Sequence, residues 1–353
     1  MIKINKSDKG ASGLKKRLLF HYKRGKGHLR RYMWNRVRWH VYPQFRQAGL
    51  YPDHVDIELS SVCNMVCPMC YTTTEPFKKL VPHKSLDFEL FKKIVDDCAR
   101  HGVYSIRLSW RGEPTLNRHF MDCIRYAKRR GVKEVDSLTN ALRLTPAMFE
   151  ELVDLQMDWL TISFDGTGAT YEEIRKPAKF PEMVAKIREF HEIKKRKNSV
   201  KPVVRIQGVW PAIKEDPERY FETFEDIVDE VSVNDLLDYL HNDDDIQYVE
   251  NFTCPVPFQR MVVGSDGRVF MCINDELGRN QVGDLNTQSI YEVWNGEGLR
   301  RVREAHIRHE GYHTFEPCKV CYQPRQTVPV PIQIGNRVIT LDQLVGREQV
   351  VGK

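Results

Sequence analysis

Between residues 54 and 234, apolar positions follow two alternating patterns. Segments that alternate or are apolar throughout predict β-strands, and segments with a period near 3.6 residues predict helices. Strands that alternate with helices form βαβ units with a parallel sheet, so the expected fold class is α/β. About six strands fit a partial (β/α)6 barrel of the TIM type or a doubly wound sheet, and both place functional side chains at the carboxyl ends of the strands. The expected strands are 54–60, 104–109, 134–140, 159–166 and 202–210, and the expected helices are 85–102, 119–131, 145–155, 180–197 and 217–230.

The pattern changes near residue 250. Residues 260–272 alternate around an Asp-Gly pair and predict a β-hairpin, and residues 289–311 have the helical period. A last hairpin is expected to turn at Gly335 and Asn336. These changes predict a small C-terminal domain of hairpin and helix beside the barrel. The expected divisions are an arm at 1–50, the barrel at 51–240, the hairpin and helix domain at 250–325 and a β tail at 326–353.

The composition is that of a folded protein without a membrane span. Of the 353 residues 41% are hydrophobic, yet no apolar run approaches the roughly 18 residues that a span needs. The N-terminus has no apolar segment followed by a cleavage site, so we expect no secretory signal. Nine cysteines without such a signal indicate a reducing compartment, where clustered thiols bind metals more often than they form disulfides. We therefore expect the protein in the cytoplasm.

The net charge of +6 is unevenly distributed along the chain. Residues 1–46 contain fourteen Lys and Arg and one acid, a net charge of +13, and the remainder carries −7. Aromatic residues lie between these bases, and Leu29, Tyr32, Met33 and Val37 approximate helical spacing. Such an arm could lie peripherally on an anionic membrane surface, contact phosphates of RNA or of an anionic substrate, or pack on the barrel with a solvated basic face. The sequence leaves these alternatives open.

Three cysteines, Cys63, Cys67 and Cys70, lie within eight residues directly after the first expected strand. Thiolates are the preferred ligands of soft metals and of iron–sulfur clusters. A structural zinc site needs four ligands, usually in paired knuckles, and this loop offers three. The count fits a 4Fe–4S cluster in which the protein binds three irons and leaves the fourth open for another molecule.

The spacing Cys-x3-Cys-x2-Cys after the first strand of an α/β barrel resembles that of the radical S-adenosylmethionine (SAM) enzymes. The resemblance implies that the open iron binds the amino and carboxylate groups of SAM. It also implies that one electron, from a flavodoxin- or ferredoxin-type donor, cleaves SAM to a 5′-deoxyadenosyl radical, which takes a hydrogen atom from the substrate. The cofactor supplies this chemistry, and the protein supplies position and electrostatics.

Later strand ends extend the resemblance. Residues 110–114 resemble the Gly-Gly-Glu-Pro motif of the family, with Arg111 in place of the first glycine. By resemblance, Glu113 accepts a hydrogen bond from the SAM amino group, Gly112 permits close backbone approach and Pro114 stiffens the turn. The other implied SAM contacts are Met69, where the family commonly has an aromatic residue, Tyr71, Asn140, Ser163 and Asp165 for the ribose, Gln207, and Arg175, which could equally be a surface arginine.

The C-terminal cysteines form a second pattern, Cys-x12-Gly-x4-Cys, a helix, and Cys-x2-Cys. It resembles the twitch domain, the short form of the SPASM domain, which implies one auxiliary 4Fe–4S cluster with four protein ligands. The spacing by itself also permits a zinc site with four thiolates. Because no cysteine follows this set, we expect two clusters in total. The expected ligands are Cys254, Cys272, Cys318 and Cys321.

The two cysteines outside both sets, Cys98 and Cys123, fall in the middle of expected helices. There we expect small buried residues rather than hydrogen donors, which favours oxidation of the substrate radical over epimerisation. The resemblance favours a carbohydrate or polyol substrate, with the auxiliary cluster as an electron relay. A peptide-modifying enzyme, and an enzyme or binding protein that acts on RNA through the arm, are the alternatives. Candidate substrate contacts are Arg111, Arg205 and Trp210.

Overall fold

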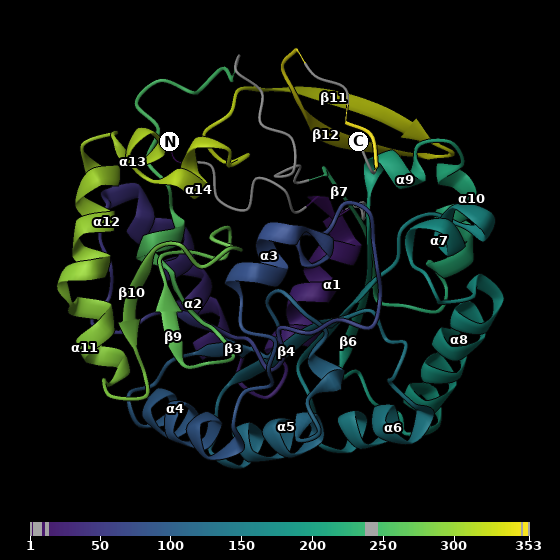
Figure 1. Cartoon of the computed structure of the whole chain (residues 1–353). Coiled ribbons are helices and arrows are strands. Elements are labelled where there is room, and N and C mark those ends of the chain that lie inside the picture. The colour runs from purple at the N-terminus through teal and green to yellow at the C-terminus, as the bar shows by residue number, and fades with distance from the viewer. Residues whose placement is uncertain (1, 3–8, 11–13, 237–245, 347–348, 352–353) are drawn as a thin grey trace.

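Six parallel strands form an open barrel at the centre of the protein, with helices around the outside (Figure 1). They confirm the expected α/β class with a partial barrel of the TIM type. The computed structural model describes residues 2, 9–10, 14–236, 246–346 and 349–351. In spatial order the barrel strands are β2 (His54–Ile57), β3 (Ser105–Arg107), β4 (Glu134–Thr139), β5 (Trp159–Ser163), β6 (Val203–Val209) and β7 (Glu230–Asn234).

The helices between these strands begin near the expected residues because the sequence carries their caps. The carboxylate of Asp87 accepts hydrogen bonds from the amides of Glu89 and Leu90 at 2.9 and 3.0 Å. The hydroxyl of Thr145 accepts one from the amide of Met148 at 3.2 Å. Such caps satisfy amide groups that lack a partner in the first helical turn. The helices are α4 (Phe88–Arg100), α5 (Phe120–Arg129), α6 (Pro146–Asp154), α8 (Phe180–Arg196) and α10 (Pro217–Phe224).

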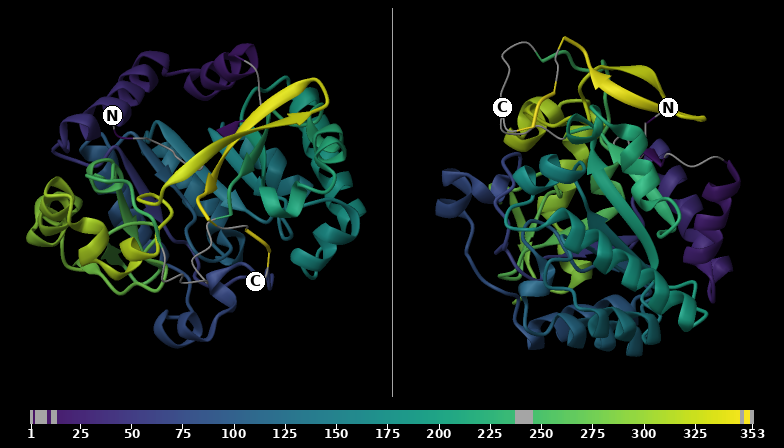
Figure 2. Two further views of the ribbon diagram at one scale, coloured as in Figure 1. Left: turned by 90° about the horizontal axis from the view of Figure 1, so that it is seen from above. Right: turned by 90° about the vertical axis from the view of Figure 1, so that its right-hand side faces the viewer.

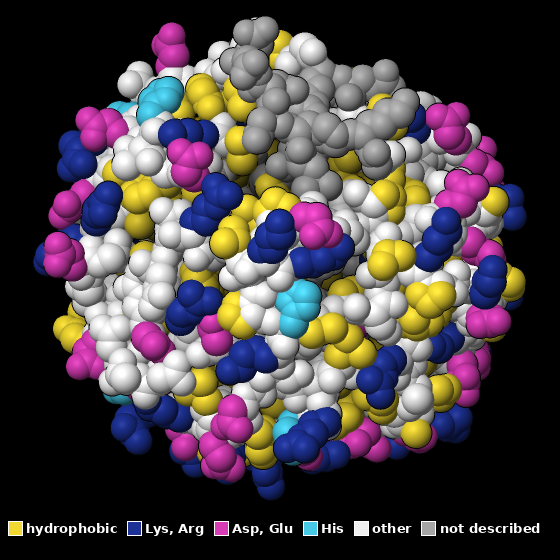
Figure 3. Space-filling view, in the orientation of Figure 1, with side chains coloured by type: hydrophobic (Ala, Val, Ile, Leu, Met, Phe, Trp, Pro, Cys, Tyr) yellow, Lys and Arg dark blue, Asp and Glu magenta, His cyan; other side chains and the backbone are white. Residues whose placement is uncertain are grey.

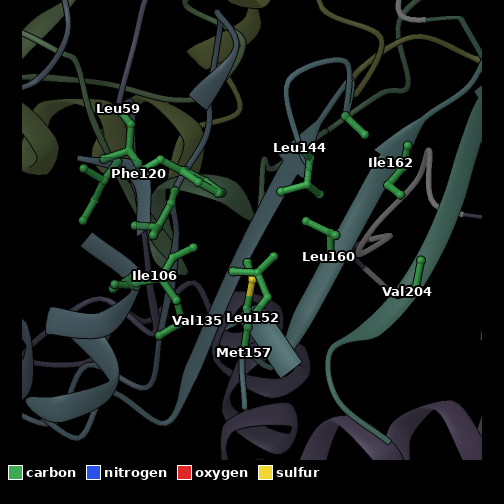
Figure 4. Close-up of a cluster of buried hydrophobic side chains, with 14 of the residues drawn as sticks. Leu59, Ile106, Phe120, Val135, Leu144, Leu152, Met157, Leu160, Ile162 and Val204 are labelled. Carbon is green, nitrogen blue, oxygen red and sulfur yellow. The ribbon is translucent and has the colours of Figure 1, made fainter. Parts of the chain in front are cut away.

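The main hydrophobic core lies between the sheet and these helices (Figure 4). Leu160 of β5 and Leu152 of α6 are both fully buried in it. Burial of a side chain of this size stabilises the fold by about 1.5–3 kcal/mol. Cys98 in α4 and Cys123 in α5 belong to the same core, with exposed fractions of 0% and 1%. The prediction that these two cysteines are buried helix residues is therefore confirmed.

The C-terminal segment continues the barrel sheet. Its first strand pairs in parallel with β2, and the next two follow in antiparallel order. The expected hairpin is confirmed, and Gly267 at its turn has a φ of +87°, which glycine adopts without strain. A domain division near residue 250 stays a prediction, since one sheet runs across it. The added strands are β8 (Arg260–Val263), β9 (Arg268–Phe270) and β10 (Gln281–Asp284).

The single helix expected at 289–311 is wrong, because the structure has separate helices there. The chain is extended at Gly296, with φ and ψ of −72° and 168°. Apolar residues continue on both sides of this break, so the periodicity gave no sign of it. The segments are α11 (Ile290–Asn295), α12 (Glu297–Ile307), α13 (Gly311–Thr314) and α14 (Glu316–Lys319).

The basic arm folds into two helices that lie across the amino-terminal ends of the barrel strands, along one side of the molecule (Figure 2). Arg24 donates a hydrogen bond to Glu134, the first residue of β4, at 2.7 Å. The side chain of Gln259, which precedes β8, donates to the carbonyl oxygen of Trp39 at 2.7 Å. The arm therefore packs on the barrel, which was one of the alternatives left open by the sequence. The helices are α1 (Leu14–Gly25) and α2 (Leu29–Val41), and β1 (Lys9–Gly10) pairs with β7.

The expected last hairpin is present and turns at residues 335 and 336. It crosses the open side of the barrel above α10 (Figure 1). The amide of Gly335 donates to Glu218 at 2.9 Å, and Arg337 pairs with Glu225 at 2.5 Å. These contacts tie the C-terminal tail to the last helix of the barrel. The strands are β11 (Thr327–Ile334) and β12 (Arg337–Leu344).

Candidate active site

The clustered cysteines lie in the loop after β2, at the carboxyl end of the barrel. The amide of Cys70 donates to the carbonyl oxygen of Cys67 at 3.0 Å, which turns the loop back on itself. Met65 anchors the loop in the core with an exposed fraction of 4%. Burial raises the pKa of the thiols of Cys63, Cys67 and Cys70, the last to about 11. Because a metal ligand must be a thiolate, these thiols lose their protons only when metal binds.

The loop after β3 packs directly on the cysteine loop. The amide of Glu113 donates to the carbonyl oxygen of Val62 at 2.8 Å. A Cβ atom on Gly112 would lie 2.4 Å from the carbonyl oxygen of Ser60, so a larger residue would push the two loops apart. Pro114 then begins a short 3-10 helix, Pro114–Leu116. Gly112 and the backbone of Glu113 thus pack directly against the start of the cysteine loop.

The carboxylate of Glu113 is buried, with an exposed fraction of 2%, and fixed by several donors. Its Oε1 accepts hydrogen bonds from the hydroxyls of Thr115 and Thr139 at 2.7 and 2.6 Å. Its Oε2 accepts one from the amide of Asn140 at 2.8 Å. A carboxylate oxygen can accept two hydrogen bonds, so Oε2 has the capacity to bind a ligand ammonium group. The expected contact with the SAM amino group stays a prediction that this geometry fits.

Asn140 links the end of β4 to the cysteine loop. Its side-chain amide donates to Asn64 at 2.8 Å and lies 3.8 Å from the sulfur of Cys63. Asn64 was not singled out from the sequence, although its place between two cysteines was the available signal. The expected role of Asn140 in binding SAM stays a prediction.

Asp165 and Arg175 form a buried pair beside the cysteine loop. Arg175 donates through Nε to Asp165 at 2.7 Å, and the other carboxylate oxygen accepts from the amide of Val209 at 2.9 Å. Burial by itself would lower the pKa of Arg175, but the charges of Asp165 and Cys67 outweigh it and raise the pKa. The alternative that Arg175 is a surface arginine is therefore wrong. Ser163, at the end of β5, is 9% exposed, and its contact with ribose stays a prediction.

Arg111 is buried against Glu58 rather than open to a substrate. Its Nε and Nη2 donate to the two carboxylate oxygens of Glu58, both at 2.6 Å, and Nη1 donates to the carbonyl oxygen of Glu276 at 3.1 Å. The guanidinium also stacks on Trp110 at 3.9 Å. The substitution of arginine for the first glycine of the motif therefore ties the end of β2 to the loop after Cys272. The expected substrate contact of Arg111 has no support in this geometry.

A cavity of about 380 Å³ lies inside the barrel, between the arm and the carboxyl ends of the strands. Arg205 lines it and stacks on Trp159 at 4.4 Å, and Gln207 lines it nearer the mouth. Of the other two substrate candidates, neither Arg111 nor Trp210 is among the described residues that line this cavity. At the mouth the lining includes Trp110, Asn274 and Glu276, and at the floor it includes Arg24, Arg36 and Trp39.

The charges inside the cavity are paired. Arg107 bonds to Asp136 at 2.6 Å, and Arg260 bonds to Asp56 at 2.9 Å. Burial would raise the pKa of Asp56, but the charges of Arg260 and His54 outweigh it and lower the pKa to about 2. The walls therefore present many donors and acceptors with little net charge, which suits a polar ligand better than an ion.

The four C-terminal cysteines come together from three segments. Cys254 precedes β8, Cys272 follows β9, and Cys318 and Cys321 lie in and after α14. Burial, with their mutual repulsion as thiolates, raises the pKa of all the thiols for which a shift is resolved, that of Cys254 to about 12. In the described part of the chain, no three Cys, His, Asp or Glu side chains are placed to share one metal ion.

Amide groups surround the sulfur atoms of this second site. The backbone amide of Asn274 donates to the sulfur of Cys272 at 3.3 Å, and its side-chain amide donates to that of Cys321 at 3.1 Å. The amide of Gln323 also donates to Cys321, at 3.4 Å. Hydrogen bonds to sulfur tune the potential of an iron–sulfur cluster.

The loop from Cys272 to Asn280 connects the two cysteine sites. The indole of Trp110 donates to the carbonyl oxygen of Ile273 at 2.7 Å. Glu276 lines the cavity and interacts electrostatically with Cys70 of the first site. Neither Asn274 nor Glu276 was identified from the sequence, because their importance depends on contacts with distant residues.

Two family models match the chain. Residues 57–207 match the Radical SAM superfamily, and residues 254–322 match SPASM, an iron–sulfur cluster-binding domain. The chain belongs to the radical SAM superfamily. This radical SAM enzyme therefore uses SAM and a 4Fe–4S cluster, which the loop with Cys63, Cys67 and Cys70 fits. The SPASM match favours an iron–sulfur cluster over zinc at the second site.

Two curated relatives are similar to this radical SAM enzyme over part of their length. The tungsten-containing aldehyde ferredoxin oxidoreductase cofactor-modifying protein of Pyrococcus furiosus is 32% identical over 143 residues, which are 36% of this chain and 39% of that protein. PqqA peptide cyclase of Ruegeria pomeroyi is 28% identical over 110 residues, which are 31% of this chain and 28% of that protein. The match thus spans less than half of either relative.

Solved structures share the fold of this radical SAM enzyme. BtrN in complex with AdoMet and 2-DOIA superposes with a TM-score of 0.55 at 19% identity, over 78% of this chain and 94% of that chain. SuiB of Streptococcus suis bound to precursor peptide SuiA superposes with a TM-score of 0.56 at 15% identity, over 84% and 76% of the two chains. At such identities the likeness establishes the fold.

Proposed function

We propose that this radical SAM enzyme oxidises a small polar substrate, of the carbohydrate or polyol type, inside the barrel cavity. The observation that carries the proposal is the cavity of about 380 Å³, which is lined at the amino-terminal ends of the strands by arm residues and at their carboxyl ends by Trp110 and Glu276. Glu276 interacts electrostatically with Cys70, so this second end lies near the cysteine loop. The paired charges of the cavity offer hydrogen-bonding groups for hydroxyls. BtrN, whose complex contains AdoMet and 2-DOIA, has the same fold and supports a small-molecule substrate.

When bound, the clusters and SAM supply hydrogen-atom abstraction from the substrate and acceptance of one electron. The chain holds the first cluster through Cys63, Cys67 and Cys70, and we assign Glu113 to the SAM amino group. The pair of Asp165 and Arg175 stands beside this loop, where it can orient the rest of SAM. We assign the auxiliary cluster to the four thiols near Asn274, where it would accept the electron that the substrate radical loses. We assign reduction of the first cluster to an electron donor of the flavodoxin or ferredoxin type.

Oxidation of an alcohol to a carbonyl releases a hydrogen atom, an electron and a proton, so the chain must accept a proton. Glu276 is a candidate by position, because it lines the cavity and interacts electrostatically with Cys70 of the first site. Burial raises its pKa to about 8, with Glu58 adding to the effect and Arg111 opposing it. A base works best when its pKa is near the working pH. We assign Glu276 as the proton acceptor.

Arg205 is the substrate-binding side chain in this proposal, since it lines the cavity from β6. Gln207 lines the same cavity, and its expected contact with SAM stays a prediction. Replacing Arg205 with methionine removes donors but retains bulk, and we expect KM to rise more than kcat falls. Arg188→Met is the matched control, because Arg188 is exposed on the outer face of α8. A kcat that falls while KM is unchanged would contradict the assignment.

A peptide is the second candidate substrate. PqqA peptide cyclase is a partial relative, and the hairpin of β11 and β12 offers a two-stranded sheet with exposed Val328 and Val338 beside the open side of the barrel (Figure 1). Extended peptides bind by adding a strand to such an edge. This candidate places the substrate outside the closed cavity.

The deciding experiment is anaerobic incubation of the reconstituted enzyme with SAM, a strong reductant and separate panels of aminocyclitols, nucleotide sugars and peptides. We expect 5′-deoxyadenosine formation to rise with a polyol, with deuterium transferred from a deuterated carbinol position. Stimulation by peptides alone would overturn the small-molecule proposal. The Glu276→Gln variant should still form 5′-deoxyadenosine but yield less carbonyl product.

A further inference from the structure

We propose that the outward face of α1 and α2 binds an anionic lipid bilayer, so that the enzyme is held at a membrane surface with its active-site mouth turned away. We call this face, defined by Leu18, Tyr22, Met33, Trp34, Val37, Val41 and Phe45, the outer arm face. No helix in the described ranges is long and apolar enough to cross a bilayer, so the contact is interfacial.

α2 has apolar residues on two opposite faces. The face that meets the barrel buries Tyr32 and Trp39, with exposed fractions of 3% and 7%. At 3.6 residues per turn, positions 33, 34, 37 and 41 lie opposite this stripe. They are Met33, Trp34, Val37 and Val41, exposed by 60%, 59%, 48% and 40%. An ordinary surface helix has polar residues on its outer face, so the second apolar stripe calls for a partner.

α1 repeats this arrangement. Phe20 is buried against Trp159, with ring centroids 5.6 Å apart, and Arg24 is buried against Glu134. Leu18 and Tyr22, on the opposite side, are exposed by 61% and 54%. Phe45, which follows α2, is exposed by 70%. Two helices and the turn after them thus each expose apolar side chains away from the barrel, and exposed apolar patches mark interaction sites.

The charge of the arm selects the partner. Lys23, Arg24 and Arg38 pair with acids of the barrel. The exposed bases in the described part of the arm are Lys26, Arg30, Arg31 and Arg46, and residues 1–46 contain one acid. By contrast, the face of the molecule seen in Figure 3 mixes Lys and Arg with Asp and Glu. An open groove of about 560 Å³ lies beside the turn between the helices, where a lipid phosphate would fit. Its basic lining consists of Arg30, Arg31 and Lys133, together with Lys128, which pairs with Asp158. Bases beside an apolar helix face are the pattern of helices that lie in an anionic membrane surface.

The same features disfavour the other occupants. A symmetric dimer would bring the same surface of two copies together, and with it two sets of bases without acids. Nucleic acid would pair with the bases and stack on Trp34, but it offers nothing to the aliphatic side chains of Leu18, Val37 and Val41. A bilayer with anionic headgroups matches both the charge and the apolar stripe.

The docking of the arm fixes the orientation. Lys23 pairs with Asp229 at 2.5 Å and Arg24 with Glu134 at 2.7 Å, so the helices are tied to the amino-terminal ends of the strands. The cysteine loop lies at the opposite end of the same strands. A bilayer on the outer arm face therefore leaves the mouth open to water, and the substrate enters from solution.

The test uses the reconstituted full-length enzyme and sedimentation with vesicles of phosphatidylcholine, with and without phosphatidylserine. We expect binding to the mixed vesicles that weakens with salt, and at least tenfold weaker binding for the double variant Met33→Glu, Val37→Glu. The matched control is Tyr291→Glu, Ile307→Glu on α11 and α12, which also replaces two exposed apolar residues with two acids. It should bind like the wild type, and 5′-deoxyadenosine formation should be unchanged in both.

Fluorescence of Trp34 gives a second measurement. We expect brominated lipid to quench part of the tryptophan fluorescence of the wild type, and to quench less of it in the Trp34→Phe variant. The proposal is overturned if the wild type does not bind the mixed vesicles, or if both double variants lose binding equally. It is also overturned if the wild type forms a dimer in sedimentation velocity that the arm variant lacks. The same holds if the wild type binds RNA in a salt-sensitive way and the arm variant does not.

Discussion

The two ends of the barrel are built in different ways. At the carboxyl end, loops that directly follow the strands supply the functional side chains, as with Cys67 after β2 and Glu113 after β3. At the amino end, the arm crosses the strands from far away in the sequence, and Arg24 meets Glu134 across 110 residues. Both ends line one cavity. The comparison shows that the carboxyl end is arranged to receive ligands and the amino end to exclude water.

Charge is also handled differently at the two ends. At the amino end Asp229 is bonded by Lys23 and Lys194, both at 2.5 Å. At the carboxyl end Arg111 pairs with Glu58 and Arg175 with Asp165, but the cysteine thiols there are buried with raised pKa values and become charged as metal ligands. Loss of a thiol at the carboxyl end should therefore affect the chemistry, and loss of a charged side chain at the amino end should affect the stability of the fold.

The largest effect is expected from Cys67→Ala. An iron without its thiolate ligand cannot be held in the open-site cluster, so we expect complete loss of SAM cleavage with the second cluster retained. Iron content and 5′-deoxyadenosine formation measure this. Cys98→Ala, in the core of α4, is the control and should keep SAM cleavage. Undiminished 5′-deoxyadenosine formation by Cys67→Ala would contradict the assignment of Cys67 as a ligand of the first cluster.

The next largest effect is expected from Arg24→Ala at the amino end. It leaves the buried carboxylate of Glu134 without its partner, and removing one member of a buried pair costs about 3–5 kcal/mol. Urea unfolding of the reconstituted enzyme measures the free energy of unfolding. Arg125→Ala breaks exposed pairs and should cost about 0–1 kcal/mol. Equal losses of unfolding free energy in the two variants would show that the pair of Arg24 and Glu134 behaves like an exposed ion pair, which would contradict the prediction.

A smaller, pH-dependent effect is expected at Asp158, which bonds Lys128 and Lys201 at 2.7 and 2.5 Å. Burial would raise its pKa, but the hydrogen bond from His28 and the two lysine charges lower it to about 2. The pKa is below its value in the unfolded chain, so the stabilisation is present above about pH 4 and is lost as the pH falls towards 2. It amounts to roughly 2 kcal/mol. Asp158→Asn should abolish this part of the acid dependence of stability, and an unchanged profile would contradict it.

The smallest effect is expected from Asn274→Ala at the second cysteine site. Hydrogen bonds to sulfur favour the more negative, reduced cluster, so their loss should lower its potential. Loss of one hydrogen bond worth about 1 kcal/mol corresponds to about 40 mV for one electron. Potentiometric EPR titration measures the shift. Asn280→Ala, in the same loop, is the control and should leave the potential unchanged.

Much of the barrel and of the first site could be predicted from the sequence. The strands and helices followed from short periodic patterns, and caps such as Asp87 lie within three residues of the amides they bind. The cysteine loop was equally accessible, because its ligands lie within eight consecutive residues. The break at Gly296 was missed, since the apolar period continues across it.

Other parts depended on contacts that the sequence does not encode locally. The sequence suggests a substrate contact for Arg111, but its guanidinium pairs with Glu58. The sequence also permits a surface position for Arg175, but this residue pairs with Asp165. Glu276 and Asn274 are functional candidates only because their loop lies between the two cysteine sites, which the sequence does not reveal.

The sequence by itself determined the succession of strands and helices, the three-thiol loop and the strongly basic arm, because each depends on residues near one another in the chain. Only the tertiary structure decided that β8 joins β2, that the arm closes the barrel and that its outer face stays apolar and exposed. The reason is physical: spacing fixes local geometry, whereas burial and charge pairing depend on which distant segments meet.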